Sequence, residues 1–128
     1  MRRRTLAMLM SATMALGAIV PVASQAAGDI DRGGDVFDTQ CAECHSVKPG
    51  KNKKGPTMFA TFGRKAGTVP DFVYSEAMKQ SGIVWTPEKV SVYVANPKGT
   101  VPGGKMKFDG KMSPQEISDL LAFLGTLH

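Results

Sequence analysis

The sequence predicts an all-α domain in which helices are joined by long loops. Three segments place apolar residues at helical spacing, whereas no segment alternates apolar and polar residues as a half-buried strand does. The chain also contains 14 Gly and 8 Pro, residues that favour turns. Helices are therefore expected to form the core, and loops to connect them over long stretches.

The first helix is expected from about Asp31 to Cys44. Four residues of this segment are spaced to share one helix face: Gly33, Val36, Phe37 and Cys41. A weaker pattern around Phe72 to Met78 would allow a short second helix. The segment between them, Ser46 to Pro70, is expected to be a long loop.

The next helix is expected to begin after Thr86, which is a good N-cap, with Pro87 at the first helical position and Glu88 in the first turn. It should end before Pro97. Its apolar face follows helical spacing: Val90, Tyr93 and Val94.

The last helix is predicted by "SPQE", in which Ser113 caps, Pro114 opens the helix and Glu116 completes a capping box. Its apolar face comprises Ile117, Leu120, Leu121, Phe123 and Leu124. The preceding segment, Pro97 to Met112, is a second long loop. Loops of this length in a compact domain commonly carry function or wrap a ligand.

Residues 1–26 have the pattern of a secretory signal peptide. Arg2 to Arg4 form a basic cluster, and an apolar run of 15 residues extends from Leu6 to Val20, before small residues. This run is shorter than the roughly 20 residues that span a bilayer. We expect cleavage after Ala26, with a cut after Ala27 or an uncleaved membrane anchor as alternatives. Residues 27–128 then form one domain in a bacterial periplasm.

The charges are unevenly distributed along the exported part of the chain. Without the three arginines of the leader, the chain has 13 basic and 11 acidic residues. The lysines gather in two stretches: Lys48, Lys51, Lys53 and Lys54, then Lys105, Lys107 and Lys111. They are either solvated surface or a docking patch for an acidic partner. Nucleic acid is not expected as a partner, because no arginine-rich or aromatic-interleaved stretch appears.

The pentapeptide "CAECH" contains both cysteines of the chain and one of its two histidines. A disulfide between Cys41 and Cys44 would close a very small loop and stabilise little, and a thioredoxin-like dithiol would need a βαβ context. The third interpretation is covalent haem attachment, the usual meaning of C-x-x-C-H. On a helical turn both thiols can reach one porphyrin, and His45 can bind its iron from the same side.

The iron also needs a ligand on its other side. The candidates are Met58, Met78, Met106, Met112 and His128. His128 is the terminal residue, and methionines commonly fill a core. Met106 differs because it lies in "VPGGKMKF", where Pro102 and two glycines can shape a loop that turns the thioether inward. Ligation by His and Met suits one-electron transfer.

These motifs together resemble class I cytochrome c, of the type close to mitochondrial cytochrome c and its bacterial periplasmic counterparts. The resemblance spans nearly all of residues 27–128. It rests on "CAECH", the Gly55–Pro56 pair, "GRKAG", "YSEAMKQSGIVW", "NPK" and "VPGGKMKF". It implies a class I cytochrome c fold, with helices and long loops around one covalently bound haem c.

The resemblance also implies roles for particular residues. Pro56 should accept a hydrogen bond from the ring of His45, and Tyr93 should point its hydroxyl toward the Met106 sulfur. Four residues should surround the haem propionates: Arg64, Tyr74, Ser75 and Trp85. Phe108 should cover the haem edge, and Gly33 and Phe37 should pack against Leu120 and Phe123.

Three positions depart from the family pattern, and each is expected to remove a polar contact. Met78 stands where an asparagine is common, and Gly104 where a threonine is common. Asn52 replaces a histidine that often precedes the Gly-Pro pair.

The function that follows is that of a monomeric periplasmic electron carrier and not an enzyme. Its donor would be a membrane quinol–cytochrome c oxidoreductase, and its acceptor a terminal oxidase, a peroxidase or a photosynthetic reaction centre. A dedicated electron acceptor of one periplasmic dehydrogenase is an alternative. A haem peroxidase or a gas sensor would need an open iron site, and a peroxidase also a distal acid–base residue.

Overall fold

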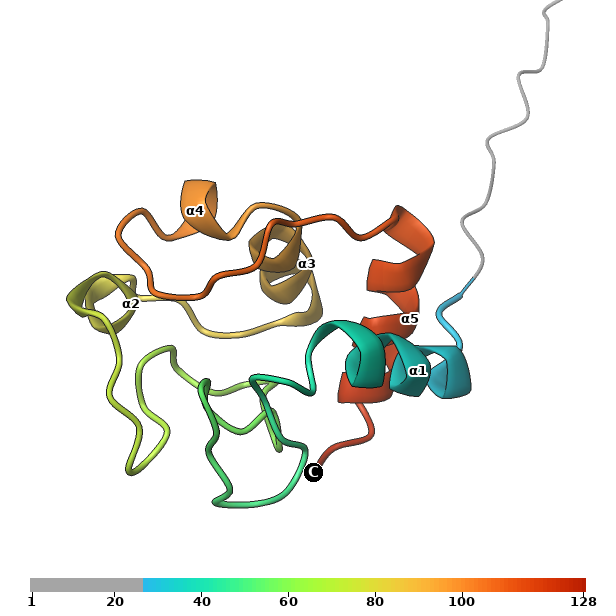
Figure 1. Ribbon diagram of the computed structural model, residues 1–128, viewed down its shortest axis with the longest axis horizontal. Coiled ribbons are helices and arrows are strands. Elements are labelled where there is room, and N and C mark those ends of the chain that lie inside the picture. Colours follow the sequence, from blue (N-terminus) through green and yellow to red (C-terminus); the bar gives the residue numbers. More distant parts are fainter. Residues whose placement is uncertain (1–26) are drawn as a thin grey trace, which may run out of the picture.

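The computed structural model describes residues 27–128, so the predicted signal peptide lies outside the described residues. Five helices follow one another: α1 (Ile30–Gln40), α2 (Glu76–Gln80), α3 (Pro87–Ala95), α4 (Pro97–Thr100) and α5 (Pro114–Leu124). No helix within residues 27–128 is long and apolar enough to cross a bilayer. Figure 1 shows α1 crossing α5, with the long loop between α1 and α2 along the lower part of the view. The predicted all-α class is confirmed.

Helix α1 ends four residues earlier than expected. Its N-cap is Asp29, and the amides of Cys41 and Ala42 both bond the carbonyl of Phe37, at 2.8 and 2.9 Å. Two amides on one carbonyl break the regular i→i−4 ladder, so the helix stops at Gln40. A single turn follows, in which the amides of Cys44 and His45 bond the carbonyl of Cys41, at 3.0 and 2.9 Å.

Helices α3 and α5 agree with the predictions. Thr86 caps α3 by accepting from the amide of Lys89, and the helix ends before Pro97. Ser113 caps α5, and its side chain and that of Glu116 form the predicted capping box. The caps satisfy amides that have no partner inside the helix, which is why they mark the starts of helices so clearly.

The two shortest helices correct the predictions. The short helix expected at 72–78 lies instead at 76–80, where the hydroxyl of Ser75 caps it. The expected loop from Pro97 to Met112 begins with α4, a single turn capped by Asn96. One isolated bridge joins Lys65 to Val84, and the described residues form no strand.

Helices α1 and α5 approach closely because a glycine in α1 and another just before it face α5. A Cβ atom on Gly28 would lie 2.1 Å from the carbonyl oxygen of Ser118, and one on Gly33 would lie 2.0 Å from that of Asp119. Beside this contact, the rings of Phe37 and Phe123 lie 5.8 Å apart. The expected packing of the first helix on the last is therefore present, and Leu120 is almost fully buried there.

Asp119 ties the two ends of the domain together and is only 3% exposed. Its carboxylate accepts from the amide of Asp29 at 2.7 Å, the Nε of Arg32 at 3.0 Å and the Nε2 of Gln115 at 2.9 Å. The Arg32 hydrogen bond, followed by that of the Asp29 amide, lowers the pKa of Asp119 to about 2. The carboxylate is thus stabilised in its charged form by folding.

Asp119→Asn should lower the melting temperature at pH 7, by about 5 °C or more for a domain of this size. A depressed folded-state pKa stabilises the fold above the unfolded value of about 3.9, and this contribution is lost as pH falls toward about 2. The deficit of the variant should therefore shrink between pH 4 and pH 2 in thermal melts. Asp35→Asn, an exposed change on α1, is the control. A deficit independent of pH would contradict the assignment.

Candidate functional site

A cavity of about 550 Å³ lies inside the fold, and its lining is mostly apolar. The loops on either side of α2, helices α3 and α5 and the loop after α4 all contribute to its walls. All ten residues predicted for the site line it: Cys41, Cys44, His45, Pro56, Arg64, Tyr74, Ser75, Trp85, Tyr93 and Met106. The fold thus brings together residues that are up to 65 positions apart in the sequence.

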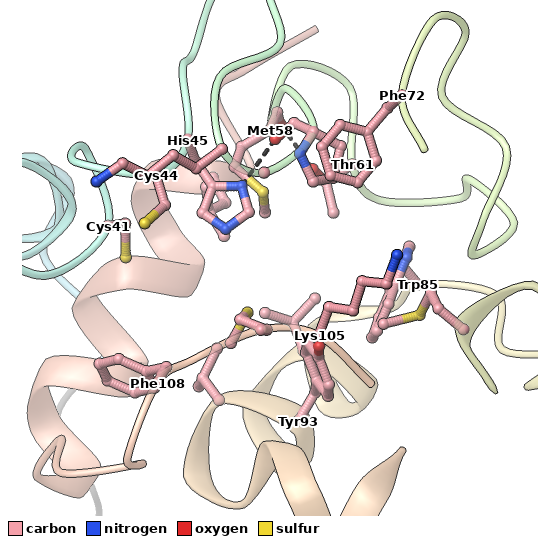
Figure 2. A pocket seen from close by; sticks show the side chains of 18 of the residues that line it. Cys41, Cys44, His45, Met58, Thr61, Phe72, Trp85, Tyr93, Lys105 and Phe108 are labelled. Atoms are coloured by element: carbon pink, nitrogen blue, oxygen red, sulfur yellow. Dashed lines mark hydrogen bonds between the residues drawn. The ribbon is translucent and has the colours of Figure 1, made fainter. Parts of the chain in front are cut away.

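The turn after α1 places the two thiols on one wall of this cavity. Figure 2 shows the sulfurs of Cys41 and Cys44 on the same side as the ring of His45. Both cysteines are free and half-buried, so they do not form the alternative disulfide. Burial raises the pKa of Cys41 to about 11, with a smaller contribution from Cys44. The Cys41 thiol therefore faces a dry surface, against which an apolar group can pack.

The imidazole of His45 is fixed in one orientation. Its Nδ1 lies 2.7 Å from the carbonyl oxygen of Pro56, which can only accept, so Nδ1 carries the proton and donates. Burial lowers the pKa of His45, which keeps the ring neutral. The lone pair is then on Nε2, and Figure 2 shows that nitrogen directed into the cavity. Backbone also packs on the ring, because a Cβ on Gly55 would lie 2.4 Å from its Cε1 atom.

The opposite wall comes from α3 and the loop after α4. Figure 2 shows Tyr93, Lys105 and Phe108 across the cavity from His45, and Met106 lies between the last two in the sequence. Met58, by contrast, lies beside His45 on the first wall.

Lining the cavity does not by itself select the second ligand. Met78 and Met112 line it together with Met58 and Met106. Met112 belongs to the buried core, at 9% exposed. His128 is exposed and is not part of the lining.

Polar groups also belong to the cavity lining. The half-buried Arg64 donates through its two terminal nitrogens to the carbonyls of Phe59 at 2.9 Å and Thr57 at 3.0 Å. Its pKa is lowered by burial. The hydroxyl of Tyr74 accepts from the amide of Val69 at 3.3 Å, and burial raises the pKa of Tyr74. The cavity lining therefore contains a fixed cation together with hydroxyl groups.

Two neighbouring aromatic rings also line the cavity. The rings of Trp85 and Tyr93 lie 5.2 Å apart, and both residues are buried. Burial raises the pKa of Tyr93, so its hydroxyl stays protonated and available as a donor.

Asn52, which was expected to remove a polar contact around the haem, lies outside the cavity lining and bonds the backbone. Its amide donates to the carbonyl of Pro70 at 2.9 Å and accepts from the amide of Thr57 at 3.0 Å. A short amide can replace a ring here because it offers both a donor and an acceptor. Met78 does place an apolar side chain in the cavity lining.

Several lining residues escaped the sequence analysis. Thr61 is 2% exposed and its hydroxyl donates to the carbonyl of Met58 at 2.7 Å. Phe72 and Val73 also line the cavity, and Val73 is 82% exposed. They lie in loops without periodicity, so no local pattern could have indicated them.

The cavity fits a haem covalently bound through both cysteines. It has the volume and apolar lining for a large flat ring, two thiols at one wall, a neutral imidazole nitrogen directed inward, and a lining cation with hydroxyls for carboxylates. The thiols and the imidazole come from the turn after α1, whereas Arg64 and Tyr74 come from the loop before α2.

Comparison with known proteins gives a consistent result. The family model for cytochrome c matches residues 30–128. Cytochrome c2 of Blastochloris viridis is 48% identical over 104 residues, which cover 80% of this chain and 81% of the relative. Cytochrome c of Arabidopsis thaliana is 44% identical over 98 residues, covering 76% and 88%. The solved structure of cytochrome cH from Methylobacterium extorquens matches with a TM-score of 0.72 and 37% identity, covering 77% and 99%.

Proposed function

Because the chain belongs to the cytochrome c family, we propose that it carries single electrons between other proteins, with His45 and Met106 as the two iron ligands. The family identification makes it an electron-transfer protein with a covalently bound haem c. Cys41 and Cys44 would form the thioether bonds, since they are the two cysteines of the chain. The haem iron supplies one-electron chemistry, and the protein supplies ligands, a dry pocket and a docking surface.

The observation that carries this proposal is the fixed imidazole of His45 facing the wall that bears Met106. The Pro56 carbonyl holds the Nδ1–H, so that Nε2 is free to bind a metal. A soft thioether on the other side favours the reduced iron and raises the reduction potential. With His45 and Met106 both bound to the iron, no coordination position would remain for a substrate. The protein would therefore not be an enzyme.

The remaining site residues would hold the edges of the haem. Arg64, Tyr74, Ser75 and Trp85 would surround its carboxylates, because all four line the cavity and a buried carboxylate needs such donors. Phe108, half-buried on the opposite wall, would cover an edge of the ring.

A visible spectrum of the ferrous protein under carbon monoxide tests the carrier function. The spectrum should stay unchanged over minutes, because both axial positions are occupied by protein ligands. Rapid formation of a carbon monoxide adduct would point instead to a haem enzyme or a gas sensor.

We place the protein in the periplasm, as a monomer that docks on membrane complexes. Residues 1–26 support export, and the resemblance to cytochrome c2 supports a quinol–cytochrome c oxidoreductase as donor. A terminal oxidase, a peroxidase or a photosynthetic reaction centre would accept the electron.

The lysines near the cavity mouth would select an acidic partner. Lys54, Lys105 and Lys107 line the cavity and are exposed. Lys54 forms an ion pair with Glu43 at 2.5 Å, whereas Lys105 and Lys107 form none with residues 27–128. Two unpaired cations therefore border the opening through which electrons would pass.

The rate of electron transfer to an acidic partner protein should fall as ionic strength rises, because salt screens this attraction. Lys105→Glu should slow the reaction about threefold or more at low salt and flatten its salt dependence. Stopped-flow kinetics over a salt series measures both effects. Lys89→Glu, the same charge reversal at an exposed residue outside the cavity lining, should have a much smaller effect. A rate that rises with salt would contradict the assigned charge.

A further inference from the structure

Asn52 lies outside the cavity lining but holds two segments that lead to it. Its side-chain nitrogen donates to the carbonyl of Pro70 at 2.9 Å, and its oxygen accepts from the amide of Thr57 at 3.0 Å. The two bonds span 18 and 5 positions of the chain. One side-chain amide therefore joins distant parts of the long loop between α1 and α2.

Thr57 transmits this constraint toward Arg64. Thr57 is 5% exposed, and its hydroxyl donates to the carbonyl of Lys48 at 2.7 Å and accepts from the amide of Phe59 at 3.1 Å. The carbonyls of Thr57 and Phe59 are the two acceptors for the terminal nitrogens of Arg64. The segment that Asn52 anchors is thus the one that positions the guanidinium.

Arg64 is a half-buried charge on the cavity wall, where its position has electrostatic consequences. A guanidinium has five N–H donors, and these two carbonyls leave others for a group in the cavity. A cation held in a low-dielectric wall favours the reduced form of a nearby redox centre, because reduction adds negative charge. If the carbonyls shift, the cation can move toward water and this effect weakens.

We propose that Asn52 is a positioning residue for the reduction potential, acting through Thr57 and Arg64. This inference rests on the proposed function of the cavity as a haem site. Asn52 contributes no group to the cavity itself, and its effect on the potential depends on the presence of Arg64.

The test is a double-mutant cycle on the haem-loaded protein, read by spectroelectrochemical titration. Asn52→Ala should make reduction about twofold less favourable, which at 59 mV per tenfold change for one electron is about 18 mV. In an Arg64→Ala background, Asn52→Ala should change the potential by much less, because the group that it positions is gone. Thermal melts should show lower stability for Asn52→Ala in both backgrounds.

Gln115→Ala is the matched control, because it removes one side-chain hydrogen bond, to Asp119, which is not part of this network. It should lower stability without shifting the potential. Where Arg64→Ala does not retain the haem, Arg64→Gln, which removes the charge but keeps an amide donor, takes its place in the cycle.

Two results would overturn the proposal: an unchanged potential in Asn52→Ala, or a shift that persists in full without Arg64. Both require a wild-type protein with a reversible one-electron couple. A wild-type protein without such a couple would instead refute the proposed function, so the two failures are distinguishable.

Discussion

Met106→Ala should keep its covalent haem but lose the weak absorption band of a thioether bound to ferric iron. The cysteines are untouched, while the opposite wall no longer offers sulfur to the iron. The reduction potential should fall on the order of 0.1 V, since the axial ligands set much of its value. Carbon monoxide should now bind the ferrous protein rapidly. Visible spectra and a redox titration measure these changes.

The other methionines of the cavity provide the controls. Met58→Ala, Met78→Ala and Met112→Ala remove a sulfur from the same lining, so they should perturb packing and stability. Each should leave the ligand band in place. If the band survives Met106→Ala, or disappears with one of the other three, the ligand is misassigned.

Gly33→Ala should destabilise the protein by about 3 kcal/mol or more, an overpacking effect at the upper end of the usual range. The added methyl carbon would lie 2.0 Å from the carbonyl oxygen of Asp119 and 2.7 Å from the Cβ of Phe123. Backbone and a Cβ atom cannot rotate away, so the helices must separate. Denaturant unfolding of the haem-loaded protein gives the difference in free energy.

The neighbouring residue is a matched control on the same helix. A Cβ on Gly34 would meet only the ring of Phe123, at an ordinary 3.7 Å. Gly34→Ala should therefore be neutral, or stabilise by up to about 1 kcal/mol through its better helix propensity. Equal effects of the two substitutions would show that the close approach of α1 and α5 does not limit stability.

Local chemistry made the starts of the longer helices predictable. Thr86 and Ser113 cap α3 and α5 as expected, because a cap needs only a side chain and the amides next to it. The predicted end of α1 was wrong, because the observed end depends on two amides that bond the same carbonyl, that of Phe37. Helix α4 was missed because a single turn carries no periodicity.

The site was predictable only where its residues form motifs. Cys41, Cys44 and His45 lie within five positions of the sequence, and the structure places them on one wall. The contribution of Thr61 arises from tertiary packing of a loop, which no local pattern records. The contacts of Asn52 were also unpredictable, because its partners lie 5 and 18 positions away.

The joining of α1 to α5 has a consequence for the order in which the molecule is made. The hydrogen bond between Asp29 and Asp119 spans 90 positions, so it forms only after nearly the whole chain is available. Bringing such distant segments together is a slow, entropically costly step of folding. The two thiols and the imidazole, in contrast, lie within five positions and need only one turn of backbone. A chain that is still incomplete can therefore present its attachment site while the pocket around it is open, and its C-terminal helix closes the fold last.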